Sequence, residues 1–141
     1  MITLLIKKLH PDAKIPEYGR EGDAAFDLYS IESVNVPPHT QVSIKTGLAL
    51  EIPFGYAGLI WDKSGLSHTH GLKTFGGVID AGYRGEISIG IMNLSNEEYV
   101  FEKGHKVAQM LIQKVETVGF EEVFKLSESE RGDGGFGSSG K

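Results

Sequence analysis

The sequence contains no cysteine, which excludes disulfide bonds and thiolate zinc sites. Basic residues are not in excess either, because the formal net charge is −5, and this argues against a nucleic-acid-binding surface. No apolar run approaches the roughly 18 residues of a membrane-spanning helix, and the short run MITLLIKK lacks the flanks of a signal peptide. We therefore expect a soluble, cytoplasmic protein with no membrane partner and no nucleic-acid partner.

Helix signals are scarce, whereas strand signals recur through most of the chain. The 141 residues, 40% of them hydrophobic, are enough for one domain with a buried core. The segment Ser64 to Gly71 gives the one short helix candidate, ending at a glycine. Short strands separated by turn signals predict an all-β fold, a jelly-roll-like β-sandwich or barrel. The expected strands cover 2–9, 24–29, 34–36, 41–52, 56–61, 99–101, 107–115 and 120–126.

The segment Lys73 to Met92 predicts a β-hairpin. Apolar residues alternate on its second half, and Asp80-Ala81-Gly82 supplies turn residues between the two halves. A carboxylate, a phenol and a guanidinium thus lie within five residues, at Asp80, Tyr83 and Arg84. They could form a catalytic corner or a solvated hairpin tip. Paired glycines at 76 and 77 favour close approach of the backbone to another group, such as a ligand.

The last fifteen residues, SESERGDGGFGSSGK, differ in composition from the rest. We expect residues 1–126 to form the β core and residues 127–141 to form a flexible, glycine-rich arm that closes the active site. Arg131 offers a planar cation, Phe136 a face for stacking, and the glycines and serines offer hydrogen-bond donors. These groups suit an anionic aromatic ligand.

Five short segments in order resemble the motifs of the trimeric dUTPases, the deoxyuridine triphosphate nucleotidohydrolases. From Gly22 to the end of the chain they are GDAAFDLYS (22–30), DKSGLS (62–67), GVIDAGYRGE (77–86), GHKVAQMLI (104–112) and RGDGGFGSSG (131–140). The resemblance implies a homotrimer with shared active sites. It also implies Mg²⁺-dependent hydrolysis of dUTP to dUMP and pyrophosphate, which removes dUTP and supplies dUMP for thymidylate synthesis.

The resemblance further implies a role for individual residues. Asp80 is the general base that activates water, Gln109 orients the water or an α-phosphate oxygen, and Asp27 helps to hold hydrated Mg²⁺. Tyr83 packs under the deoxyribose. The implied phosphate ligands are Lys63, Ser64, Gly65, Arg131, Gly137, Ser138 and Ser139, and the implied uracil contacts are Thr74, Gly77, Val78, Ile79 and the ring of Phe136.

The second motif departs from the family, which usually has Pro-Arg where this chain has Asp62-Lys63. Lysine keeps the cation but lacks the fork geometry of arginine, and Asp62 adds a negative charge beside the expected phosphates unless it points away or pairs with Lys63. Thr74 lies where several relatives have asparagine.

Several residues also have structural interpretations. Asp27 could be a buried acid paired with an arginine, and Gln109 a core amide satisfied by backbone. Trp61 fits a core or interface position, and Arg84 fits either an inter-subunit ion pair or the ligand. The spacing of His68, His70 and His105 is only a weak signal for a metal site, so a structural or solvated role is favoured for these residues.

Two other functions compete with dUTP hydrolysis. One is deamination of dCTP on the same fold, alone or coupled to triphosphate cleavage, for which Glu86 is a nearby carboxylate. The other is a trimeric nucleotide-binding regulator without turnover.

Overall fold

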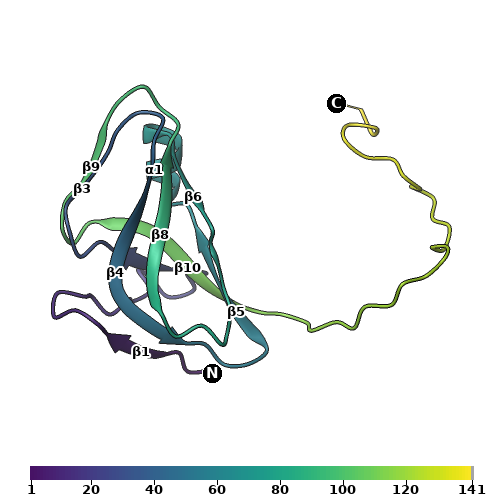
Figure 1. Cartoon of the computed structure of the whole chain (residues 1–141), viewed down its shortest axis with the longest axis horizontal. Helices are drawn as coiled ribbons and strands as arrows, with labels where there is room; N and C mark the ends of the chain where they lie inside the picture. Colours follow the sequence, from purple (N-terminus) through teal and green to yellow (C-terminus); the bar gives the residue numbers. More distant parts are fainter. Residues whose placement is uncertain (141) are drawn as a thin grey trace.

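The computed structural model describes residues 1–140, and Lys141, the end of the predicted arm, lies outside this range. Two four-stranded antiparallel sheets and one two-stranded sheet build the body (Figure 1). The first sheet has the order β1 (Leu5–Lys8), β4 (Gln41–Glu51), β8 (Glu86–Asn93), β6 (Leu72–Phe75). The second has the order β2 (Phe26–Tyr29), β10 (Lys106–Lys114), β5 (Tyr56–Trp61), β7 (Val78–Ile79), and β3 (Val34–Val36) pairs with β9 (Tyr99–Phe101).

One core joins the three sheets. Along β8 the isoleucines at 87, 89 and 91 are buried while Ser88 between them is exposed, as the period of two predicts. They belong to one apolar cluster with residues of both other sheets, which includes Leu28, Ile44, Ile60, Phe101 and Met110. Burying these aliphatic faces supplies the main driving force for folding.

The one helix among residues 1–140 is short: α1 (Ser64–His70) comes shortly after β5. It ends where predicted, because Gly71 adopts a left-handed φ of 66° and its N–H bonds to the Ser67 carbonyl. None of its residues is buried, so α1 stays at the surface of the body.

The segment predicted as one hairpin divides between two sheets. Strand β6 pairs with β8 in the first sheet, but β7 pairs with β5 in the second, so Val78 and Ile79 do not pair with the isoleucine strand. The chain crosses at the paired glycines, where Gly76 has a φ of 63°. A Cβ on Gly77 would lie 2.6 Å from the Ile60 carbonyl oxygen. The close approach predicted for these glycines is therefore made, at Gly77, to strand β5.

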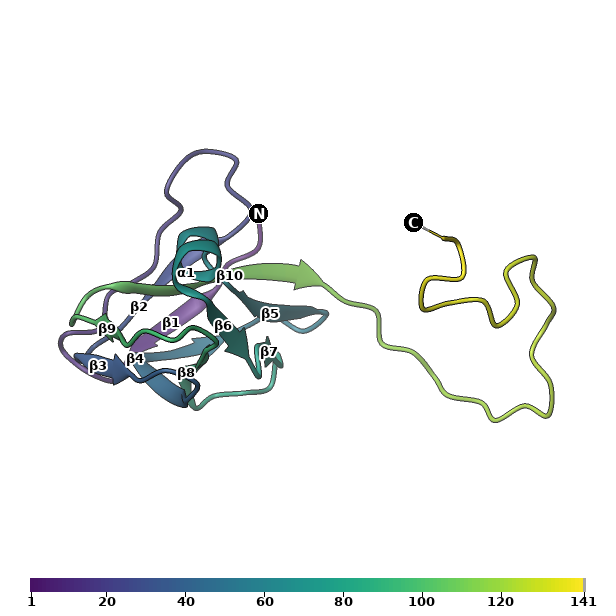
Figure 2. The ribbon, with the colours of Figure 1, turned by 90° about the horizontal axis from the view of Figure 1, so that it is seen from above.

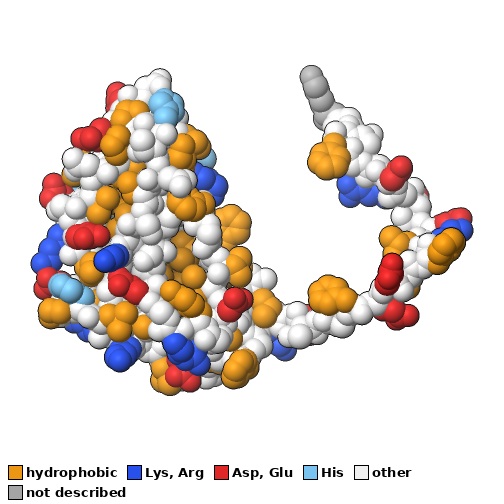
Figure 3. Space-filling view, viewed as in Figure 1, with side chains coloured by type: hydrophobic (Ala, Val, Ile, Leu, Met, Phe, Trp, Pro, Cys, Tyr) orange, Lys and Arg blue, Asp and Glu red, His pale blue; other side chains and the backbone are white. Residues whose placement is uncertain are grey.

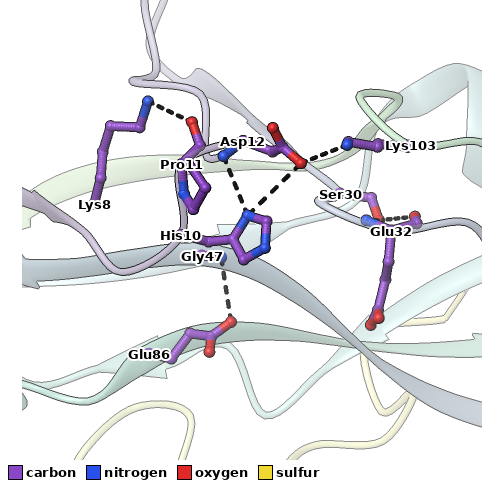
Figure 4. A network of polar contacts seen from close by, with 9 residues as sticks. All are labelled: Lys8, His10, Pro11, Asp12, Ser30, Glu32, Gly47, Glu86 and Lys103. Atoms are coloured by element: carbon purple, nitrogen blue, oxygen red, sulfur yellow. Dashed lines mark hydrogen bonds and ion pairs between the residues drawn. The ribbon is translucent and has the colours of Figure 1, made fainter.

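A break in β4 accommodates the N-terminal loop. The pairing of β4 with β8 shifts register between Lys45 and Ala49, and Gly47 has a φ of 68°. A Cβ there would lie 3.0 Å from Ala13. Figure 4 shows the polar contacts around this bulge, in which the Glu86 carboxylate accepts a hydrogen bond of 3.2 Å from the Gly47 N–H.

Beyond β10 the chain leaves the body as an extended arm, residues 116–140, seen from two directions in Figures 1 and 2. The last hydrogen bond to the body is from the Val115 N–H to the Gly55 carbonyl, at 2.9 Å. The strand predicted over 120–126 is wrong for this chain on its own, because no edge strand of the body pairs with these residues. Their apolar side chains, including those of Phe120 and Phe124, are exposed, and hydrophobic groups stand out singly along the arm in Figure 3.

The prediction of a mostly β fold with one short helix is confirmed. The division into a core of residues 1–126 and an arm of residues 127–141, and assembly into a homotrimer, stay predictions. Within residues 1–140, no helix has the length and apolar character that a membrane span needs.

Candidate active site

Four predicted site residues from distant parts of the sequence meet at one cavity, which we call the Lys63 cavity. It has a volume of about 650 Å³ and lies where β5 ends and α1 begins, beside β2 and β10. Asp27, Lys63, Ser64 and Gln109 all line it. The antiparallel register explains this convergence, because Gln109 on β10 lies opposite Asp27 on one side and Trp61 on the other.

Two lysines hold the carboxylate of Asp27. Lys63 Nζ lies 2.5 Å from Oδ1 and Lys106 Nζ lies 2.8 Å from Oδ2. Burial raises the pKa of Asp27, but the hydrogen bonds and charges of Lys106 and Lys63 outweigh it, so the net pKa is lowered. Asp27 is therefore ionised at neutral pH, and its cationic partners are lysines rather than the arginine that the structural interpretation assumed.

Gln109 is fixed by the backbone at the end of β5. Its Nε2 donates a hydrogen bond of 2.7 Å to the carbonyl oxygen of Asp62. The side chain is half-buried and still lines the Lys63 cavity, so it combines a structural contact with access to whatever occupies the cavity. The amide in this apolar strand thus has the fixed orientation that positioning a small molecule needs.

A second, smaller cavity of about 200 Å³ lies along β6 and β7, and we call it the Gly77 cavity. Thr74, Gly77 and Val78 line it, and Ile79 follows as a half-buried residue paired with Gly58. Trp61 lines both cavities and is 53% exposed, so it is not a core residue. The two cavities therefore share the Trp61 side chain in their walls.

The Asp62 side chain faces away from Lys63. Its Oδ1 accepts hydrogen bonds from the Thr74 N–H at 2.7 Å and the Thr74 hydroxyl at 2.6 Å, and Lys73 Nζ lies 2.9 Å from Oδ2. Burial raises the pKa of Asp62, but the Thr74 and Lys73 contacts together lower it below its usual value. Both donors of Thr74 are thus used within the chain, which leaves none of its N–H or O–H groups for a ligand.

Asp80 and Tyr83 occupy an exposed turn that reaches neither cavity. The Tyr83 N–H bonds to the Asp80 carbonyl at 3.1 Å, and the Tyr83 hydroxyl donates to the Glu86 carbonyl at 2.9 Å. Arg84 donates to the Ala81 carbonyl at 2.6 Å and approaches Glu51 at 3.5 Å. Arg84 therefore braces the turn within its own chain, while the Asp80 carboxylate is exposed to solvent.

The tip of the arm gathers the predicted ligands of the fifth motif around a hollow of its own. Arg131, Phe136, Gly137, Ser138 and Ser139 line this hollow of about 420 Å³. Arg131 Nε donates to the Gly134 carbonyl at 2.6 Å, and Phe136 is fully exposed. The arm tip lies apart from the strands of the body (Figure 2).

Sequence reasoning missed Lys106 and Lys73. The core position that it allowed for Trp61 is wrong, and the interface position stays a prediction. Lys106 immediately precedes the predicted strand that carries Gln109, but its contact with Asp27 depends on strand register, which the sequence does not show. The three histidines have separate surroundings, and His68 lines the Lys63 cavity. His70 packs on Tyr99 with ring centroids 4.8 Å apart, and His105 Nδ1 accepts a hydrogen bond from the Glu102 N–H.

Comparison with known proteins decides the family. Residues 11–140 match the dUTPase family model. The deoxyuridine 5′-triphosphate nucleotidohydrolase of Nautilia profundicola is 46% identical over 99% of this chain and 100% of its own length. That of Clostridium kluyveri is 42% identical, over 99% of both chains. The chain belongs to the dUTPase family.

A solved relative shows how far the resemblance extends in three dimensions. A single-residue variant of the Staphylococcus bacteriophage 80alpha dUTPase, solved with dUpNHpp, superimposes with a TM-score of 0.94 at 34% identity, covering 100% of both chains. Coverage at this level includes the arm as well as the β body, so all five motifs lie within the shared dUTPase fold.

The geometry of Glu86 bears on the deaminase rival. The carboxylate is half-buried and accepts a hydrogen bond from Gly47 in the β4 bulge, as Figure 4 shows. It lines neither the Lys63 cavity nor the Gly77 cavity. Glu86 therefore bonds to the β4 bulge within its own chain.

Proposed function

We propose how this chain carries out the dUTP diphosphatase activity of its family, the hydrolysis of dUTP to dUMP and pyrophosphate. One observation carries the proposal. Asp27, Lys63, Ser64 and Gln109 converge on the Lys63 cavity, and Thr74, Gly77 and Val78 line the Gly77 cavity, which shares Trp61 with it. The exposed Asp80 turn and the arm tip present further predicted groups elsewhere on the chain.

The Lys63 cavity receives the triphosphate. Lys63 supplies positive charge, and Ser64 and Gly65 begin α1 with unpaired backbone N–H groups. Phosphate oxygens compete with Asp27 for Lys63, so binding releases part of that ion pair. Arg131, Gly137, Ser138 and Ser139 of an arm cover the phosphates from the other side.

Asp80 accepts a proton from the attacking water. The water oxygen forms a bond to the α-phosphorus, the bond to the oxygen bridging the α- and β-phosphorus breaks, and pyrophosphate leaves with that electron pair. Gln109 holds the water or an α-phosphate oxygen in line. General-base catalysis of this kind contributes about 10²–10⁴ in rate.

The base and sugar are recognised by the turn and its strand. Gly77, Val78 and Ile79 face uracil with backbone groups, Tyr83 packs beneath the deoxyribose, and Phe136 stacks on the ring. Thr74 lines the Gly77 cavity but donates no hydrogen bond to the base, because both of its donors already bond to Asp62. A 2′-hydroxyl on the sugar meets the Tyr83 ring.

The residues present fit a magnesium ion that arrives with the triphosphate. Among residues 1–140, no group of three potential metal-ligating side chains comes together. Asp27 stays ionised at the cavity wall and is suited to holding the ion through bound water, since Mg²⁺ keeps much of its hydration shell. When bound, Mg²⁺ neutralises phosphate charge and favours pyrophosphate as a leaving group.

Each active site is shared among the chains of a homotrimer. Two features support this. The Asp80 turn does not reach the Lys63 cavity of its own chain, and the arm extends from the body with its apolar side chains exposed. Exposed apolar groups along an extended segment are typical of a chain that packs on a partner.

The activity is tested with a panel of dUTP, dCTP, dTTP and UTP, with Mg²⁺ present or chelated. We expect pyrophosphate from dUTP alone, no ammonia from dCTP, and loss of turnover on chelation. Ammonia release from dCTP would instead support the deaminase, and binding of dUTP without pyrophosphate release would support the non-catalytic regulator.

The shared site has its own experiment. Asp80→Asn and a truncation ending at Glu130 are each expected to be inactive, and they are refolded together so that mixed trimers form. If a site combines Asp80 of one chain with the arm of another, some mixed sites regain both intact parts and activity returns. A dead mixture, with mixed trimers verified by mass, would make the arm a lid over its own chain.

A further inference from the structure

Asp62 connects three parts of the proposed site. Its backbone carbonyl receives the Gln109 amide at 2.7 Å, and its side-chain Oδ1 receives two hydrogen bonds from Thr74 on β6. Lys63, the next residue, begins the turn that precedes α1. One residue thus contacts β10 and β6 and adjoins the Lys63–Gly65 turn.

The contacts are those of a fixed residue. The Asp62 side chain is 20% exposed and is held by hydrogen bonds of 2.6 and 2.7 Å, with Lys73 Nζ at 2.9 Å as a further cation. Charge-assisted hydrogen bonds of this kind are stronger than neutral ones. The Asp62 side chain is therefore held against β6 by Thr74, while the carbonyl of the same residue orients Gln109.

We infer that Asp62 is a positioning residue for dUTP hydrolysis, acting through the Oδ1 contacts with Thr74 that hold Gln109 and the Lys63–Gly65 turn in place. The inference rests on the proposed function of the Lys63 cavity. The negative charge of Asp62 is not what the reaction uses; the acceptor atom Oδ1 is.

The contacts of the two carboxylate oxygens give a sharp test. Both Thr74 donors bond to Oδ1, whereas Lys73 Nζ contacts both oxygens, at 2.9 Å to Oδ2 and 3.1 Å to Oδ1. Asparagine keeps Oδ1 and loses the charge, while alanine loses both. Asp62→Ala and Asp62→Asn thus have the same charge. They differ in whether an Oδ1 atom is present to accept the Thr74 hydrogen bonds.

We expect Asp62→Ala to lower kcat/KM for dUTP about tenfold or more, because misplacing a positioning group by a fraction of an ångström to 1 Å costs up to about 10² in rate. We expect kcat to fall because Gln109 is misplaced, and KM to rise because the Lys63–Gly65 turn is misplaced. Asp62→Asn should recover most of the lost kcat/KM. Thr74→Val, which keeps the N–H donor and removes the hydroxyl, should fall between the two.

Asp12→Ala is the matched control, since Asp12 pairs with Lys103 on an exposed loop away from both cavities. Folding is checked by thermal unfolding and by emission of Trp61, the one tryptophan of the sequence and the neighbour of Asp62. A purely structural Asp62 would lower the unfolding temperature and leave kcat of the folded enzyme unchanged.

Three outcomes overturn the inference: wild-type kcat/KM in folded Asp62→Ala, an Asp62→Asn variant as impaired as Asp62→Ala, or wild-type kcat/KM in Thr74→Val. The proposed function fails separately, if the wild-type chain releases no pyrophosphate from dUTP in the same assay.

Discussion

The body and the arm hold their predicted site residues in opposite ways. In the body, Asp27 forms ion pairs with two lysines, and Gln109 donates a hydrogen bond to a backbone carbonyl. These side chains are therefore oriented before any ligand binds. In the arm, the hydrogen bonds of Arg131 and the residues after it stay within the arm, and Phe136 is fully exposed. Preorganised groups lose little entropy on binding, whereas an extended segment must be ordered at that moment. We therefore expect substitutions of the water-activating residues of the body to act on kcat, and arm substitutions to act on capture and closure.

The largest expected effect is in the body, at Asp80. Asp80→Asn keeps the shape of the side chain but cannot accept a proton from water, so we expect kcat to fall by at least about 10². Affinity for a non-hydrolysable dUTP analogue should stay close to that of the wild-type chain. A variant that kept more than about a tenth of wild-type kcat would remove Asp80 from the role of base.

The next effect comes from removing the arm tip. A chain ending at Glu130 should lose most of its kcat/KM, because Arg131 and Phe136 no longer close the site. Its thermal unfolding should match that of the full-length chain, since the tip makes none of its hydrogen bonds to the body. If the unfolding temperature fell sharply as well, the arm tip would be part of the structural core of the assembly, and the contrast between the regions would not hold.

Within the arm, a single ring tests capture. Stacking of a base on an aromatic ring contributes about 1–3 kcal/mol, so Phe136→Ala should raise KM for dUTP about tenfold and change kcat less. Phe136→Trp keeps an aromatic face and serves as the matched control. Equal KM values for the alanine and tryptophan variants would show that Phe136 does not stack on uracil.

The body was more predictable from sequence than the arm, because its signals lie within single short segments. The alternation of Ile87, Ile89 and Ile91 predicts that one face of a strand is buried, and Gly71 predicts the end of a helix. The arm carries a similar apolar pattern around Phe120 and Phe124, but a strand also needs a neighbour to pair with, and the isolated chain supplies none. The pattern was present, but the described residues of this chain offer it no strand to pair with.

Of the candidate site, the convergence of Asp27, Lys63, Ser64 and Gln109 followed from the motifs, but their partners did not. Nothing in the spacing shows that Lys106 shares Asp27 with Lys63, because that contact depends on the register of β2 and β10. The direction of the Asp62 side chain depends in the same way on the approach of β6 to the end of β5. Contacts across sheets are set by tertiary structure, which single-sequence patterns do not encode.

The smallest expected effect returns to the body, at the departure from the family pattern. Lys63→Arg restores the fork that matches phosphate geometry, and an arginine can contact Asp27 and a phosphate oxygen together, where the lysine ammonium must divide its contacts. We expect kcat/KM for dUTP to stay within about threefold of wild type or to rise modestly, mainly through KM. Lys106→Arg is the matched comparison, because Lys106 also pairs with Asp27 but does not line the Lys63 cavity, so its KM should not improve. Suppose that kcat/KM for dUTP fell tenfold or more in Lys63→Arg but not in Lys106→Arg. The site would then require the compact ammonium group of lysine between Asp27 and the phosphates, and the body would be preorganised for lysine at this position.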